Sequence, residues 1–215
     1  DEAFFSAELS FDGRFETDAT FKIHGTENNI LWQKEALLNY LIKQLPMKYT
    51  KVCWVDSDLI FADRHWLEQM EKILDDYPVA QGFSQCVFLN HKGAQERSMS
   101  SIAFSGEKYR GAKGMCWGAN LSALPDGELM DRFAIGGGDG RLVEAWRGHT
   151  DSEHVKCLSC QHHEYALQNY QKYYNTVKNR IGCLPGTVSH LFHGTNENRK
   201  TNKRYQILKR HRYDP

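Results

Sequence analysis

The stretch from Lys51 to Val55 is a short run of mainly apolar residues that ends in two carboxylates, Asp56 and Asp58. A run of this length predicts a buried strand. Helical patterns flank it at residues 28–45 and 64–76, and a further strand region is expected at 79–89. Strands that alternate with helices indicate an α/β fold, a three-layer sandwich with a mainly parallel central sheet. The two aspartates would then lie at the carboxyl edge of that sheet, where open α/β sheets bind ligands.

The rest of the chain continues this pattern, and its 215 residues suit one domain over residues 1–215. Residues 4–23 alternate around Asp12-Gly13, which predicts a hairpin or two short strands. Residues 90–115 show no clear period and are expected to be irregular. The sequence also predicts an apolar stretch at 115–119 and a strand at 184–192. It predicts three helices, of which one begins near residue 139 and the others extend over 162–179 and over 197–210.

The charge of the chain is zero overall but uneven. Residues 194–215 carry +5 and the remaining residues −5. A basic tail on an acidic body suggests a phosphate-bearing partner, although a solvated helix face explains it equally well. No run approaches about 18 apolar residues, so no membrane span is predicted.

The six cysteines are spread along the chain. Cys53 and Cys116 sit among apolar residues, as free cysteines that serve as small core residues do. This usage predicts a reduced, intracellular protein and a cytoplasmic location. Cys157 and Cys160, followed by His163, have a spacing that leaves a zinc-stabilised binding module as an alternative.

Three motifs carry candidate chemistry. Asp56-Ser57-Asp58 can hold a hard divalent cation through its oxygens, or it can be a polar turn after a strand. Asp139, after Gly136-Gly137-Gly138, can accept a proton from an acceptor hydroxyl, or it can cap the helix that follows, or do both. The glycines would let a ligand approach the backbone closely.

The third motif is His190-Leu191-Phe192-His193-Gly194. The two imidazoles would point to opposite faces of a strand, so both can face one site only if the strand ends between them. A neutral imidazole beside carboxylates suits manganese. Arg199 and Lys203, with Arg204, follow closely and could neutralise a diphosphate.

Together these motifs resemble nucleotide-sugar glycosyltransferases of the GT-A fold. The matching pieces are Leu31-Trp32-Gln33-Lys34-Glu35, Trp54-Val55-Asp56-Ser57-Asp58, Trp117-Gly118-Ala119, Gly136-Gly137-Gly138-Asp139 and His190-Leu191-Phe192-His193-Gly194. Residues 136–148 and 188–192 are similar to stretches of the polypeptide N-acetylgalactosaminyltransferases. The ending looks more like a phage and bacterial branch of such enzymes.

The resemblance implies a metal-dependent transferase with Mn²⁺ or Mg²⁺ and a nucleotide-diphosphate sugar, foremost a UDP-sugar, as donor. It implies a metal bound by Asp56, Asp58 and His190, with His193 as the second choice of histidine. Gly137 and Gly138 would face the donor sugar, and Asp56, Arg199 and Lys203 would contact the nucleotide sugar. Asp139 would be the general base, which suits an inverting enzyme, whereas the N-acetylgalactosaminyltransferases retain configuration.

Two departures from the family pattern matter. Asp139 stands where the relatives have glutamate, and the first strand-helix unit of the GT-A fold is not evident before Phe4. That unit either lies upstream or is replaced by the segment at 4–23. Candidate acceptors are a hydroxymethylated base of phage DNA and a glycan. The alternative enzyme is a sugar-nucleotide pyrophosphorylase, whose usual Gly-rich signature is missing.

Overall fold

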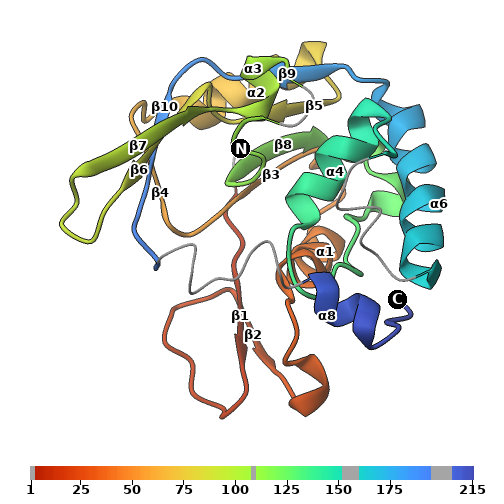
Figure 1. The fold of residues 1–215 in the computed structure, drawn as a ribbon. Helices are drawn as coiled ribbons and strands as arrows, with labels where there is room; N and C mark the ends of the chain where they lie inside the picture. Colours follow the sequence, from red (N-terminus) through yellow and green to blue (C-terminus); the bar gives the residue numbers. More distant parts are fainter. Residues whose placement is uncertain (1–2, 108–109, 152–159, 195–204) are drawn as a thin grey trace.

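The computed structural model describes residues 3–107, 110–151, 160–194 and 205–215, and it shows a mixed α/β fold (Figure 1). Its strands are β1 (Ala7–Ser10), β2 (Phe21–His24), β3 (Lys51–Val55), β4 (Leu59–Phe61), β5 (Val79–Gln81), β6 (Gln85–Leu89), β7 (Gln95–Ser100), β8 (Cys116–Asn120), β9 (Ile181–Cys183) and β10 (Thr187–His190). Its α-helices are α1 (Lys34–Gln44), α2 (Trp66–Asp76), α3 (Ile102–Ser105), α4 (Gly138–Arg147), α6 (Cys160–Val177) and α8 (Tyr205–Arg210). Short 3-10 turns lie at Glu27–Asn29, Leu121–Ala123 and Pro125–Gly127.

The strands form three sheets, with the orders β1-β2, β4-β10-β6-β7 and β3-β8-β5-β9. The prediction of a mainly parallel central sheet is wrong. β8 lies between β3 and β5 and is antiparallel to both, while β5 and β9 are parallel. The sequence pattern suggested helical crossovers between successive strands, but the β6–β7 hairpin and α3 precede β8 and return the chain from the opposite direction.

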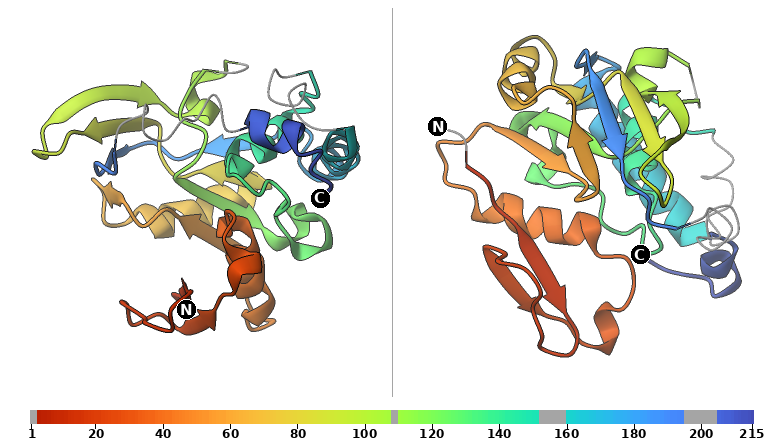
Figure 2. Two further views of the ribbon diagram at one scale, coloured as in Figure 1. Left: turned by 60° about the horizontal axis from the view of Figure 1, so that its bottom comes forward. Right: turned by 90° about the vertical axis from the view of Figure 1, so that its left-hand side faces the viewer.

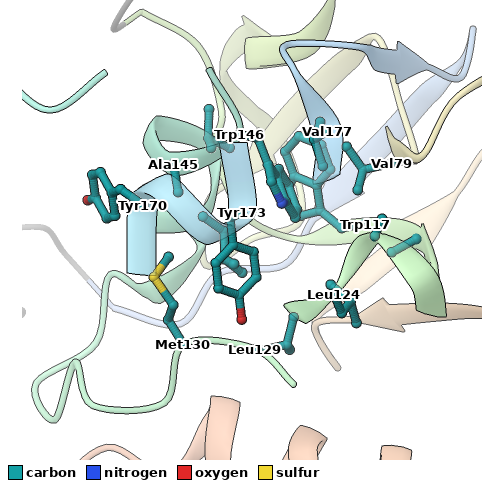
Figure 3. Close-up of a cluster of buried hydrophobic side chains, with 14 of the residues drawn as sticks. Val79, Trp117, Leu124, Leu129, Met130, Ala145, Trp146, Tyr170, Tyr173 and Val177 are labelled. Atoms are coloured by element: carbon teal, nitrogen blue, oxygen red, sulfur yellow. The ribbon is translucent and has the colours of Figure 1, made fainter. Parts of the chain in front are cut away.

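Helices cover both faces of the β3-β8-β5-β9 sheet, as expected for a layered fold. Successive side chains of β8 point to opposite faces: Trp117 packs with α4 and α6, whereas Cys116 packs with α2. Trp117 and Trp146 meet edge to face, with ring centroids 4.9 Å apart, in the core drawn in Figure 3. Burial of these large aromatic side chains stabilises the packing on this face of the sheet.

The N-terminal segment forms a separate small sheet, which lies beyond α1 from the two larger sheets (Figure 2). Residues 7–10 and 21–24 are the two short strands expected, but they pair in parallel and do not form a hairpin. α1 itself buries two polar side chains, Glu35 and Asn39, more deeply than the leucines of its sequence pattern.

The segment 90–115, expected to be irregular, holds β7 and α3. β7 pairs antiparallel with β6 in a hairpin that extends away from the body of the molecule (Figure 1). Its side chains are nearly all exposed, so an apolar alternation is missing from its sequence. Of the basic helix expected over 197–210, the structure shows α8, and residues 197–204 lie outside the described part of the chain.

Candidate functional site

The two aspartates of the Asp56-Ser57-Asp58 motif follow β3, as the sequence predicts, but they face different partners. The backbone N–H of Asp56 donates to the carbonyl of Met115 (2.7 Å), so Asp56 still continues the pairing of β3 with β8. Asp58 lies in the turn between β3 and β4, and its carbonyl accepts a hydrogen bond from the N–H of Leu191 (2.9 Å). The turn therefore separates the two carboxylates.

Asp58 lies beside both histidines of the third motif. Its Oδ2 atom is 3.6 Å from Nε2 of His190 and 3.0 Å from Nδ1 of His193. β10 ends at His190, so the chain leaves the strand before His193 and both imidazoles reach the same carboxylate. One ligand atom from each of these three residues lies within 4.8 Å of the others.

This set of donor atoms fits a divalent cation. Two atoms that each bind the same ion at a distance of about 2.1 Å lie roughly 3.0–3.5 Å from each other. The distances from Oδ2 of Asp58 to the two imidazole nitrogens are close to this range. The second carboxylate oxygen of Asp58, Oδ1, is buried and has no hydrogen-bond partner among the described residues. Because buried polar atoms are normally satisfied, this oxygen is suited to a bound ion.

His190 is oriented for binding through Nε2. Its Nδ1 atom lies 2.9 Å from the carbonyl oxygen of Leu191, which assigns the ring proton to Nδ1 and directs the lone pair of Nε2 toward Asp58. Burial lowers the pKa of His190 against the opposing effect of Asp58, and this favours the neutral imidazole that metals bind. His193 is more exposed, and its 3.0 Å contact with Asp58 also fits a hydrogen bond whose proton a cation would displace.

Asp56 lies outside this cluster and is held by a lysine instead. Nζ of Lys34 is 2.6 Å from Oδ1 of Asp56 and 2.9 Å from Oδ2 of Asp139. Burial alone would lower the pKa of Lys34, but the carboxylates of Asp139 and Asp56 outweigh it and raise this pKa. Burial raises the pKa of Asp56, while Lys34 opposes the shift. The metal and donor roles predicted for Asp56 remain predictions.

Asp139 lies in the first turn of α4, after the glycine stretch, as predicted. Gly136 and Gly137 both have positive φ, 81° and 93°, a conformation that favours glycine and turns the chain into the helix. Gly138 packs against Glu35, since a Cβ atom at this position would overlap with Oε1 of Glu35. The predicted contacts of Gly137 and Gly138 with a donor remain predictions. Among the described residues, no backbone N–H of α4 donates a hydrogen bond to the side chain of Asp139, whose carboxylate accepts from Lys34 instead.

Lys34 and Glu35 are the residues that sequence reasoning did not single out for a role. Both belong to the Leu31–Glu35 piece of the family resemblance, which was the only signal available. Glu35 is 3% exposed and accepts a hydrogen bond from Nε1 of Trp32 (3.0 Å). Burial, with the charge of Asp139, raises the pKa of Glu35 to about 7.

Two predicted ligands of the diphosphate, Arg199 and Lys203, lie outside the described residues. The same holds for Cys157 of the zinc alternative and for the side chain of Cys160. Cys53, Cys86, Cys116 and Cys183 are free thiols.

Comparison with known proteins gives no assignment. Family models, curated proteins and solved structures all yield no match to this chain. Among the described helices, none has the length and apolar character needed to span a bilayer.

Proposed function

We propose that this protein is a metal-dependent glycosyltransferase with a GT-A-like architecture. It would transfer a sugar from a nucleotide-diphosphate sugar, foremost a UDP-sugar, to a hydroxyl acceptor. The observation that carries the proposal is the convergence of Asp58, His190 and His193 from two distant segments. Three of the motifs that resemble the GT-A family, at residues 56–58, 136–139 and 190–194, thus contribute side chains near the end of β3, which supports the proposal.

The metal site would serve the leaving group. Mn²⁺ or Mg²⁺ bound by Asp58, His190 and His193 would neutralise the charge that develops on the departing nucleoside diphosphate. Asp58 contributes a carboxylate, and the two histidines contribute neutral nitrogens, so the bound ion keeps positive charge for the diphosphate oxygens. Arg199 and Lys203, with the basic tail to which they belong, are proposed to add further contacts to the diphosphate.

Asp139 would accept the proton of the acceptor hydroxyl as this oxygen attacks the anomeric carbon. Lys34 binds Oδ2 of Asp139, which leaves Oδ1 as the oxygen that can take the proton. A single displacement of this kind inverts the anomeric configuration, so the product's stereochemistry is part of the test. Gly137 and Gly138 would admit the donor sugar close to the backbone.

A shallow cavity of about 340 Å³ adjoins Lys34 and offers room for the nucleoside. Leu31 and Trp32 line it, and half of each of these side chains is exposed. Exposed apolar and aromatic surface beside charged groups is typical of ligand sites. The acceptor stays open between a modified DNA base and a glycan, and the intracellular location stays a prediction.

Incubation of the protein with a panel of nucleotide sugars and Mn²⁺ tests the proposal, with and without candidate acceptors. We expect release of a nucleoside diphosphate that requires the metal and increases with an acceptor. Release of inorganic diphosphate would instead identify a pyrophosphorylase. Tightly held zinc in stoichiometric amount, with no turnover of any donor, would support the binding module.

A further inference from the structure

We propose that Lys34 is a positioning residue that binds Asp56 and Asp139 together and so fixes the proposed base relative to the metal cluster. This inference rests on the proposed function, because it assigns a consequence to the place of Asp139. Lys34 also lines the cavity proposed for the nucleoside, but its ammonium group is bound by the two carboxylates, through which the proposed role acts.

The two contacts of Lys34 link segments that are far apart in the sequence. Its ammonium group lies within 2.6 and 2.9 Å of carboxylates that belong to the end of β3 and the start of α4. The side chains of Lys34, Asp56 and Asp139 are 21%, 29% and 20% exposed. Ion pairs this sheltered are screened less than pairs on the surface, and charge-assisted hydrogen bonds are the stronger class.

The helix that carries Lys34 is itself fixed on the segment that leads to Asp139. Asn39 exchanges two hydrogen bonds with the backbone of Leu129, of 2.9 and 2.7 Å. The N–H of Trp32 donates to the carbonyl of Ala134 (2.9 Å). These contacts, with the packing of Glu35 on Gly138, hold the start of α1 against residues 129–138, so Lys34 extends from a rigid base toward β3.

The backbone on the other side of Asp139 restricts this carboxylate further. A Cβ atom at Gly114 would lie 2.8 Å from Oδ2 of Asp139, so the chain passes close to the same oxygen that Lys34 binds. Without the ammonium group, Asp56 and Asp139 would face each other as like charges, which repel and separate. Loss of Lys34 should therefore move Asp139 while leaving Asp58, His190 and His193 in place.

Kinetics of two Lys34 variants test the positioning role. Lys34→Met removes the charge and keeps the length, and Lys34→Arg keeps the charge. Lys43→Met is the matched control, since Lys43 lies on the same helix with its side chain 61% exposed and pairs with Glu128 at 2.5 Å. A misplaced catalytic group can slow a reaction about 10²-fold.

We expect Lys34→Met to lower kcat about 100-fold, with the donor KM and the affinity for Mn²⁺ within about threefold of wild type. Lys34→Arg should recover at least a tenth of the wild-type kcat, and Lys43→Met should behave as wild type. An unchanged kcat in Lys34→Met would overturn the positioning role. A loss confined to the donor KM would show that Lys34 contacts the substrate and would overturn it as well.

A double-mutant cycle tests the link between Lys34 and Asp139 without any activity. The free energies of unfolding in urea are measured for Lys34→Met, for Asp139→Ala, which removes the carboxylate that Lys34 binds, and for the double variant. The pair should be non-additive, whereas Lys43→Met combined with Asp139→Ala should be additive. Additive effects of the Lys34 and Asp139 substitutions would overturn the link between these residues, even if the protein transfers sugar. If the wild-type protein transfers no sugar, the proposed function is overturned, but the measured link is not.

Discussion

The backbone N–H of Leu191 donates a 2.9 Å hydrogen bond to the carbonyl oxygen of Asp58. It joins the residue after β10 to the turn after β3, and β4 and β10 pair directly beside it. The side chain of Asp58 consequently faces His190 and His193, although some 130 residues separate the two segments. The candidate metal site is thus a product of strand pairing between distant parts of the chain.

His190→Ala should weaken Mn²⁺ binding more than His193→Ala. The side chain of His190 is 10% exposed and its Nδ1 lies 2.9 Å from the Leu191 carbonyl oxygen, whereas the side chain of His193 is 35% exposed and its Nδ1 lies 3.3 Å from the same oxygen. A fixed ligand contributes more than one that must be ordered on binding. Isothermal titration of both variants checks this, with thermal melting as the control for folding. A larger loss in His193→Ala would identify His193 as the principal ligand.

Much of the metal cluster could be predicted from sequence, since Asp58 and both histidines stood out by position. Whether the imidazoles share a face depends on where β10 ends, which a sequence pattern locates only to within a few residues. The pairing of Asp56 with Lys34, away from the metal cluster, could not be predicted, because it depends on a side chain of α1. Glu35 and Asn39 are buried polar residues, and the packing of Glu35 on Gly138 and the hydrogen bonds of Asn39 to Leu129 depend on tertiary structure. The parallel sheet was predicted wrongly for the same reason, since strand direction depends on how the chain returns through β7 and α3.

Asp139→Asn should slow sugar transfer by about 10²–10⁴-fold, because the amide cannot accept the acceptor's proton. Its oxygen can still accept a hydrogen bond from Lys34, so the fold and donor binding should stay near wild type. Steady-state kinetics and the donor dissociation constant, measured side by side, check the split. Transfer at a normal rate in this variant would remove Asp139 as the base.

Gly138→Ala should destabilise the protein by about 1–3 kcal/mol, because the new methyl group overlaps with Glu35 in a packed site. Gly140→Ala is the matched control on the same helix, since its added Cβ would meet only Lys113 Cδ, at 3.6 Å. Alanine also favours a helix over glycine, so the control should melt at or above the wild-type temperature. Equal melting temperatures for the two variants would contradict the packing of Gly138 on Glu35.

Glu35 should make stability depend on pH in the direction opposite to an ordinary carboxylate. Its pKa is raised from 4.5 to about 7 in the folded protein, so between these values the folded state keeps a proton that the unfolded state has lost. The contribution of Glu35 to the free energy of unfolding is therefore complete below about pH 4.5 and declines as the pH rises to about 7. The decline is on the order of 3 kcal/mol. Glu35→Gln keeps an acceptor for Trp32 and should remove this decline. Urea unfolding of both proteins at pH 5 and 7.5 measures it, and an equal decline in the variant would assign the effect to another group.

The most direct measurement is the affinity of the protein for a UDP-sugar with and without Mn²⁺, in wild type and in Asp58→Asn, by isothermal titration. Coupling between metal and donor is reciprocal, so each should tighten the binding of the other in wild type. Asp58→Asn should lose this coupling. Asp75→Asn is the control and should keep it, because Asp75 is an exposed carboxylate on α2. We expect Mn²⁺ to tighten donor binding at least tenfold in wild type and in the control and not in Asp58→Asn. Donor binding that is the same with and without Mn²⁺ in wild type, or that responds equally to Mn²⁺ in Asp58→Asn, would contradict a donor-binding metal site at Asp58, His190 and His193.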